Sequence, residues 1–334
     1  MFGGEKKPLI APKEGGSKSL DYKEYKEGNV QMKHPGELRI LSIDGGGMKG
    51  ILPAVYLKRV EQQLGKPIHH YFDMICGTST GGIIALGLAA GISAGDIADL
   101  YIKKGEKIFP KNLLTNPFLS AKYSNKKLIK TLKDVLGEKR LEDANTMLCI
   151  PSIEHHKAEP KVFKTPHHKD YILDGCRFMW EVALATSAAP LYFPAAEIGE
   201  AECKIDGGLW ANNPLLVAIA EAKKIGFDLE QVKILSLGTG DSIYQVSNKV
   251  AKKSGLKDWR TNLVDLTLQV QSKSATYTAH YLLGENLCRI SPTFGRKLTL
   301  DSTRKKDIEF MVVEANQLFE KTFIKNDVRN NFFN

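Results

Sequence analysis

Residues 37–50 read ELRILSIDGGGMKG, and this stretch decides the fold class. Its first half, which ends at Ile43, is a short apolar run that predicts a buried strand. Glycines follow at once, and the apolar spacing of residues 50–64 then predicts a helix. A strand, a glycine-rich turn and a helix in this order indicate a sheet of the α/β class.

The same alternation continues along the chain. We expect further strands at residues 72–76, 147–152, 162–164, 203–205 and 232–237. Expected helices cover residues 82–90, 124–136, 177–185, 214–224, 263–283 and 303–323, and Ser93 with Asp96 predicts a capping box before another helix. The pattern predicts a parallel or mixed sheet covered by helices on both faces, with its site at the carboxyl ends of strands.

Length and composition favour a single folded unit. The chain has 334 residues, of which 43% are hydrophobic and 25% charged, so a large core is expected. We expect one domain over residues 36–334 behind a polar, flexible leader over residues 1–35. The leader lacks the layout of a secretory signal, and the longest apolar run, residues 81–91, is too short to span a bilayer. These features predict a soluble, cytoplasmic protein.

Cysteine usage and charge limit the partners. The five cysteines form no C-x-x-C pair, so neither a metal site nor a disulfide framework is expected. The net charge is +9, and residues 103–140 hold eleven Lys or Arg against three Asp or Glu. Such a basic segment can contact nucleic acid, an anionic membrane or an anionic ligand. No recognised nucleic-acid motif is present, so we expect no nucleic-acid polymer as partner.

Three glycine-bounded turns carry the chemistry. Gly45, Gly46 and Gly47 leave backbone N–H groups uncovered before a helix, which suits a phosphate or the oxyanion of an acyl transfer. Residues 77–81 read GTSTG between an expected strand and an expected helix, which is the setting that G-x-S-x-G needs around a nucleophilic serine, Ser79. Asp206 ends another expected strand.

Two other interpretations of these turns stay open. Gly45, Gly47 and Gly50 also match the dinucleotide fingerprint G-x-G-x-x-G, although the second expected strand does not end in an acidic residue. A Ser-Asp-His triad would need a histidine after Asp206, and His280 alone follows it, within an expected helix. The remaining histidines come mostly in pairs, as at residues 69–70, 155–156 and 167–168, and we expect these pairs in surface loops.

Four stretches together resemble the patatin-like phospholipase family: DGGGMKG at 44–50, GTSTG at 77–81, ATSAAPLYFP at 185–194 and DGGLWANNP at 206–214. The resemblance implies a three-layer α/β/α sandwich around a mostly parallel central sheet. It implies hydrolysis of fatty acyl esters of phospholipids without a metal or other cofactor. Leu184 stands where the family usually has an arginine.

The resemblance also assigns roles to the residues of the turns. It implies Ser79 as nucleophile and Asp206 as its base, with no histidine between them. Residues 45–47 would supply the oxyanion hole. The supporting glycines would be Gly77, Gly81, Gly207 and Gly208.

The polar leader and compact core resemble bacterial intracellular members of that family. Some of those members are effectors of anti-phage signalling in which a cyclic dinucleotide switches on membrane phospholipid degradation. The resemblance therefore implies a membrane phospholipid surface and a cyclic dinucleotide activator as partners. It also implies peripheral association with the inner face of the membrane, and a role for residues 103–140 as a lid or as a surface for membrane or ligand.

Overall fold

The buried strand that the sequence predicts before the first glycine turn is present as β1, which lies inside the central sheet. The computed structural model describes residues 32–108, 120–199, 202–242, 256–324 and 328–333. Across the sheet, the strands are β5 (Ala196–Ile198), β6 (Glu202–Asp206), β3 (Met147–Glu154), β2 (Met74–Gly77), β1 (Leu38–Ile43), β7 (Val232–Leu237) and β9 (Leu287–Ile290). β4 (Glu159–Lys164) also pairs with β3, and the short strands β8 (Asp241–Ser242) and β10 (Thr293–Phe294) pair with each other.

The sheet is mixed, with a parallel centre. β1 runs parallel to both β2 and β7, and the pairs β2–β3 and β7–β9 are parallel as well. β4 and β6 run antiparallel to β3, and β5 runs antiparallel to β6. The antiparallel strands thus gather on one side of the sheet, beyond β2.

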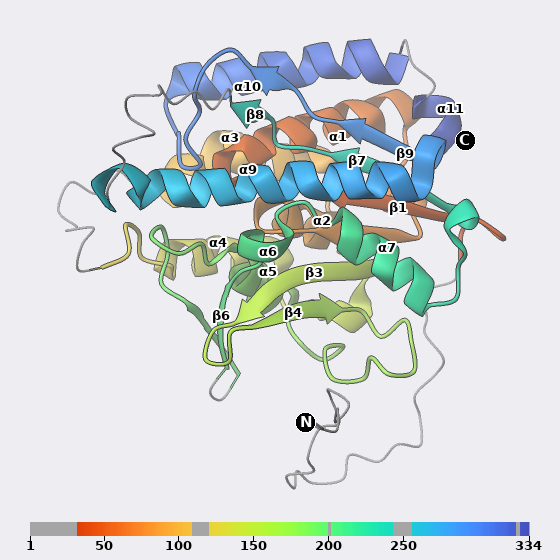
Figure 1. Cartoon of the computed structure of the whole chain (residues 1–334), viewed down its shortest axis with the longest axis horizontal. Coiled ribbons are helices and arrows are strands. Elements are labelled where there is room, and N and C mark those ends of the chain that lie inside the picture. Colours follow the sequence, from red (N-terminus) through yellow and green to blue (C-terminus); the bar gives the residue numbers. More distant parts are fainter. Residues whose placement is uncertain (1–31, 109–119, 200–201, 243–255, 325–327, 334) are drawn as a thin grey trace, which may run out of the picture.

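Helices cover both faces of the sheet (Figure 1). They are α1 (Ile51–Leu64), α2 (Thr80–Ala89), α3 (Ala94–Ile108), α4 (Lys126–Leu136), α5 (Met179–Ser187), α6 (Gly208–Ala211), α7 (Leu215–Lys224), α9 (Leu256–Leu283), α10 (Lys305–Phe319) and α11 (Val328–Phe332). Side chains of β1 alternate between the faces, as a strand requires. Leu41 and Ile43 pack with α1, α2 and α10, whereas Leu38 and Ile40 pack with α7 and α9. The predicted three-layer α/β/α arrangement is confirmed.

The predicted elements are present, with shifted ends and some additions. Ser93 Oγ accepts a hydrogen bond from the Asp96 N–H at 3.0 Å, as the predicted cap before α3 requires. α9 begins seven residues earlier than the sequence predicts, at Leu256. The sequence did not predict β5, β9 or α6, each of which has only three or four residues.

The end of the expected leader contacts the folded body. The N–H of Lys33 donates to Asp73 Oδ1 at 2.7 Å, and His34 Nδ1 lies 2.9 Å from Asp73 Oδ2. Residues 1–31 of the leader and residues 109–119 of the basic segment lie outside the described residues. The domain division at residue 36 stays a prediction. Among the described helices, none combines the length and apolarity that crossing a membrane would require.

Candidate active site

A tight turn between β2 and α2 holds Ser79. Its φ of 54° and ψ of −122° lie where residues other than glycine are rarely found. The Ser79 N–H donates to Thr186 Oγ1 at 3.0 Å, which fixes this backbone. A Cβ on Gly77 would collide with the carbonyl oxygen of Gly81, and a Cβ on Gly81 would collide with that of Ile43. Both glycines are therefore needed for so close a turn.

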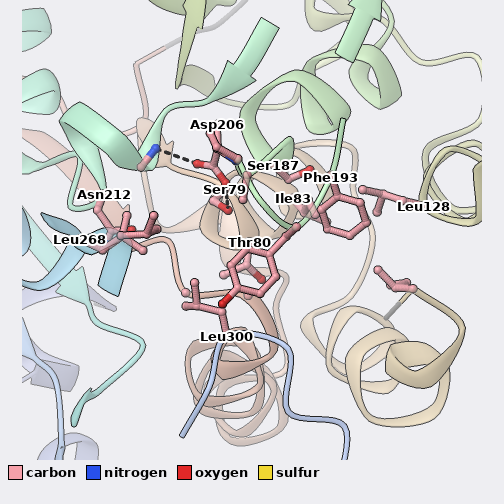
Figure 2. Close-up of a pocket in the computed structure, with 18 of the residues that line it drawn as sticks. Ser79, Thr80, Ile83, Leu128, Ser187, Phe193, Asp206, Asn212, Leu268 and Leu300 are labelled. Carbon is pink, nitrogen blue, oxygen red and sulfur yellow. Dashed lines mark hydrogen bonds between the residues drawn. The ribbon is translucent and has the colours of Figure 1, made fainter. Parts of the chain in front are cut away.

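Asp206 meets Ser79 at the end of β6. Ser79 Oγ donates a hydrogen bond of 2.6 Å to Asp206 Oδ2 (Figure 2). The sequence predicted a site at the carboxyl ends of strands on a parallel or mixed sheet, and Asp206 does end β6. However, β6 runs antiparallel to β3, and β3 lies between β6 and β2. β3 continues beyond the end of β2, and its Ser152 pairs with Asp206. Asp206 thus reaches Ser79 along the overhanging end of β3, from the opposite chain direction.

The Asp206 carboxyl group is buried, with 5% of the residue exposed. Burial raises its pKa from 3.8 to about 6, although hydrogen bonds from Ser79 and from the Gly208 N–H oppose the rise. The Gly208 N–H lies 2.7 Å from Oδ1, so each carboxylate oxygen has one donor. An aspartate with this pKa is mostly ionised at neutral pH and can accept a proton there.

The glycine loop after β1 lies beside Ser79. The Gly45 N–H donates to the Asn212 carbonyl oxygen at 2.8 Å, and Thr239 Oγ1 donates to the Gly45 carbonyl oxygen at 2.7 Å. Gly46 and Gly47 line the same cavity as Ser79. Neighbouring groups leave no room for a side chain in this loop. A Cβ on Gly45 would collide with Asn212, one on Gly46 with Thr239, and one on Gly47 with the Leu300 carbonyl group.

A buried ion pair anchors the start of this loop. Arg289 of β9 donates to both carboxylate oxygens of Asp44, from Nη1 at 2.7 Å and from Nη2 at 2.6 Å. Ser272 of α9 adds a bond of 2.8 Å to Asp44 Oδ2. Two neighbouring elements therefore hold the residue that precedes Gly45.

Gly207 and Gly208 form the turn into α6. A Cβ on Gly207 would collide with the Pro151 carbonyl oxygen of β3, which limits this position to glycine. Gly208 begins α6 and directs its N–H at Asp206, as described above. The turn therefore fixes the carboxylate as well as reversing the chain.

A cavity with about 860 Å³ of empty space, partly open to solvent, lies in front of Ser79 and Asp206. Its walls are mostly apolar and include Ile83, Leu128, Phe193, Leu268 and Leu300, which surround Ser79 in Figure 2. The apolar walls of this cavity fit a hydrocarbon chain.

Two residues singled out in the sequence lie apart from this chemistry. His280 is exposed on α9, and Asp206 bonds Ser79 directly, so no histidine stands between the two. Leu184, at the position of the family's arginine, is 1% exposed and packs in the hydrophobic core.

The expectation that paired histidines occupy surface loops is wrong for His167. Its side chain is 2% exposed, and its Nε2 lies 3.0 Å from Glu221 Oε1. Cys149 Sγ also lies within 4.8 Å of these groups, so the three atoms have the proximity of metal ligands. The Lys164 ammonium group, however, lies 2.5 Å from Glu221 Oε2 and already neutralises the carboxylate. We interpret this cluster as a buried ion pair.

Sequence reasoning assigned no role in the candidate active site to Thr186, Asn212 or Arg289. Thr186 and Asn212 lie within two of the four stretches that resemble the family, and that position was the available sign of a role. Arg289 lies on β9, which the sequence did not predict, and nothing in the sequence marks it as a partner of Asp44.

The sequence is similar to those of several known proteins. The model of the family "Patatin-like phospholipase" matches residues 41–219. A cGAMP-activated phospholipase of Vibrio cholerae is 31% identical over 89% of this chain and 94% of its own length. One of Pseudomonas aeruginosa is 34% identical over 75% of this chain and 77% of its own length.

More distant similarities were also found. The human calcium-independent phospholipase A2-gamma is 31% identical over 85% of this chain and 38% of its own length. The crystal structure of VipD from Legionella pneumophila superposes with a TM-score of 0.43 at 14% identity, over 86% of this chain and 67% of VipD. On the family match and the identities to its curated relatives, the chain belongs to the patatin-like phospholipase family and is a hydrolase.

Proposed function

We propose that this hydrolase cleaves fatty acyl esters of membrane phospholipids through a dyad of Ser79 and Asp206. One observation carries the proposal: the Ser79 hydroxyl group donates to a buried carboxylate at 2.6 Å, at the wall of an apolar cavity. A carboxylate in hydrogen-bond reach of a serine can act as its general base. The domain over residues 36–334 would carry this activity, with residues 1–35 as its leader.

In the first step, Asp206 accepts the proton of Ser79 while Oγ attacks the ester carbonyl carbon. The negative charge that forms on the carbonyl oxygen would be stabilised by the N–H groups of Gly46 and Gly47, which line the cavity. The Gly45 N–H already donates to Asn212, so Gly45 would contribute by holding the loop in place. The amino end of α2 adds a favourable dipole next to Ser79.

Collapse of the tetrahedral intermediate breaks the ester bond. Protonated Asp206 returns its proton to the leaving alkoxide, and the fatty acyl group remains on Ser79 Oγ. In the second half, Asp206 takes a proton from a water molecule that attacks this acyl ester. The fatty acid then leaves as Ser79 regains a proton, so that the dyad ends as it began.

Substitution of the dyad tests this proposal. Ser79→Ala and Asp206→Ala should each lower hydrolysis of a short-chain soluble ester at least 1,000-fold, because each removes a reacting group. Ser274→Ala and Asp134→Ala remove exposed counterparts and should keep wild-type turnover. Circular dichroism of each variant checks the fold. A folded Ser79→Ala protein with normal turnover would refute the dyad.

His280→Ala tests the alternative triad. We expect near-wild-type turnover, because Asp206 contacts Ser79 without an intervening imidazole. A loss of two orders of magnitude or more in a folded His280→Ala protein would favour a Ser-Asp-His mechanism instead.

We further propose that a cyclic dinucleotide activates the enzyme in antiviral defence, and that the enzyme acts at the cytoplasmic face of the membrane. Support comes from two relatives that cover most of this chain and carry the name cGAMP-activated phospholipase. Release of fatty acids from bacterial lipid vesicles should rise at least tenfold when cGAMP is added. Full activity that a panel of cyclic nucleotides leaves unchanged would contradict activation but not the dyad.

A further inference from the structure

Helix α4 divides its side chains between the cavity and solvent. Leu128, Thr131 and Leu132 are buried and line the cavity in front of Ser79. The opposite side of the same helix carries the exposed lysines Lys126, Lys127, Lys130 and Lys133. One short helix therefore joins the wall of the cavity to a strongly basic surface.

The lysines of the first turns are not neutralised by the described residues. Within the described part of the chain, no carboxylate forms an ion pair with Lys126, Lys127 or Lys130. Lys133 differs, because its ammonium group lies 4.1 Å from the centre of the Trp180 ring. Asp134 adds an acidic group to this side of α4, toward its carboxyl end. The positive charge is thus concentrated where α4 begins.

An exposed leucine contacts the segment that precedes α4. Leu191 is 50% exposed and has a φ of 71°, a left-handed conformation that costs free energy in a residue other than glycine. Its neighbours Pro190 and Tyr192 line the cavity. The Leu191 carbonyl oxygen accepts from the N–H of Lys122 at 3.0 Å, which ties it to the segment that leads into α4.

We propose that Leu191 and the lysines Lys126, Lys127 and Lys130, here called the docking face, bind the surface of an anionic phospholipid bilayer. Exposed apolar residues together with exposed lysines are typical of proteins that lie on such surfaces. Unpaired lysines on a convex helix suit many phosphates in a plane, whereas a single nucleotide needs a concave site. The inference rests on the proposed function, since it presents the acyl-chain cavity to its lipid substrate.

The test compares two triple variants of the full chain. Lys126→Gln/Lys127→Gln/Lys130→Gln changes the docking face, and Lys305→Gln/Lys306→Gln/Lys321→Gln removes the same charge from exposed helical positions elsewhere. Each triple is made on Ser79→Ala, so that lipids stay intact while binding is measured. Co-sedimentation uses vesicles of phosphatidylcholine alone and with 30% phosphatidylglycerol, in 0.1 M salt, with and without cGAMP.

We expect the docking-face triple to bind the anionic vesicles about 100-fold more weakly than Ser79→Ala alone, and the control triple to bind as Ser79→Ala does. Leu191→Asn should also weaken binding, because asparagine tolerates the left-handed backbone but does not insert into lipid. Equal binding by the two triples overturns the proposal. The proposal is also overturned if the Ser79→Ala protein does not bind anionic vesicles either with or without cGAMP.

Further readouts separate the remaining explanations. If the docking-face triple keeps vesicle binding but loses cGAMP binding by calorimetry, the lysines belong to a nucleotide site, and the proposal is wrong. On the active background, hydrolysis of a soluble ester should stay within twofold of wild type, because these lysines line no part of the cavity. A wild-type protein without ester hydrolysis even when cGAMP is present would refute the proposed function, while vesicle binding would still decide the docking face.

Discussion

At the scale of single residues, the buried carboxyl group of Asp206 lowers the stability of the folded protein when it is ionised. Burial raises its pKa from 3.8 to about 6, so an ionised Asp206 makes the folded state less stable by about 3 kcal/mol. This cost is absent below about pH 3, where the group is protonated in both the folded and the unfolded state. It grows as the pH rises and is complete above pH 6. Active-site groups with shifted pKa values commonly carry such costs.

Asp206→Asn should therefore stabilise the protein in alkaline but not in acidic solution. The amide keeps the shape of the side chain and has no charge to bury. We predict a melting temperature about 4 °C above wild type at about pH 8 and no gain at about pH 3. Thermal unfolding at the two pH values measures the difference. An equal change at both pH values would mean that Asp206 is not ionised at a cost in the folded protein.

The sequence also indicated single residues of the candidate site. Ser79 could be picked out from the sequence because it lies between glycines that its turn requires. The role expected for Asp206 came from the resemblance to the family, since an aspartate followed by glycine is also common in ordinary turns. The contacts of Thr186 with Ser79 and of Asn212 with Gly45 could not be predicted, because each joins positions more than 100 residues apart. Such pairings arise from tertiary packing, which local sequence does not encode.

At the scale of elements, strand direction could not be predicted from the sequence. Alternation of apolar residues is the same whichever way a strand runs, so β6 carries no mark of its antiparallel pairing with β3. The sequence did not predict β9, because the charged residue Arg289 interrupts its short apolar run. That interruption is what anchors the glycine loop, through the ion pair with Asp44.

Arg289→Met should disturb both stability and turnover. It leaves the Asp44 carboxylate buried without its partner, which typically costs about 3–5 kcal/mol. The double variant Arg289→Met/Asp44→Asn removes both charges and should regain most of that stability. Turnover of a soluble ester should stay at least tenfold low in both, because the loop before Gly46 has lost its anchor. Denaturant unfolding and kcat measure the two effects, and normal kcat in the double variant would contradict the role in positioning.

A second buried carboxylate, Glu221, fixes α7 to β4. Burial alone would raise its pKa, but bonds from His167 and Lys164 lower it from 4.5 to about 2. The pKa of Glu221 is thus lowered in the folded protein, whereas the pKa of Asp206 is raised. The ionised group adds about 3 kcal/mol of stability above pH 4.5, and this is lost as the pH falls toward 2.

Glu221→Gln should therefore destabilise the protein at pH 7 and make its unfolding less sensitive to acid. We predict that the difference from wild type narrows between pH 4.5 and pH 2 in urea unfolding. Glu230→Gln, at an exposed position, serves as the control and should behave as wild type. A difference that stays constant over this range would show that Glu221 does not act through its ionised form.

At the scale of the whole molecule, the fold brings three distant turns to one edge of the sheet. The alternation of elements predicted the layers, and the four stretches resembling the family predicted which turns meet. The sequence did not predict that β3 extends beyond the end of β2, which lets Asp206 approach Ser79 from the opposite chain direction. The cavity could not be predicted from the sequence either, because its walls come from distant segments, among them α3, α4, α9 and the segment around Leu300.

Covalent labelling of Ser79 by a fluorophosphonate, followed by mass spectrometry, tests the dyad most directly. The reagent reacts with an activated serine hydroxyl group, so its rate reports whether Asp206 takes the proton. We predict a wild-type rate that rises tenfold per pH unit below an apparent pKa of about 6 and then levels off. Asp206→Asn should label at least 100-fold more slowly at pH 8. Labelling of folded Asp206→Asn at the wild-type rate would contradict the Ser79–Asp206 mechanism.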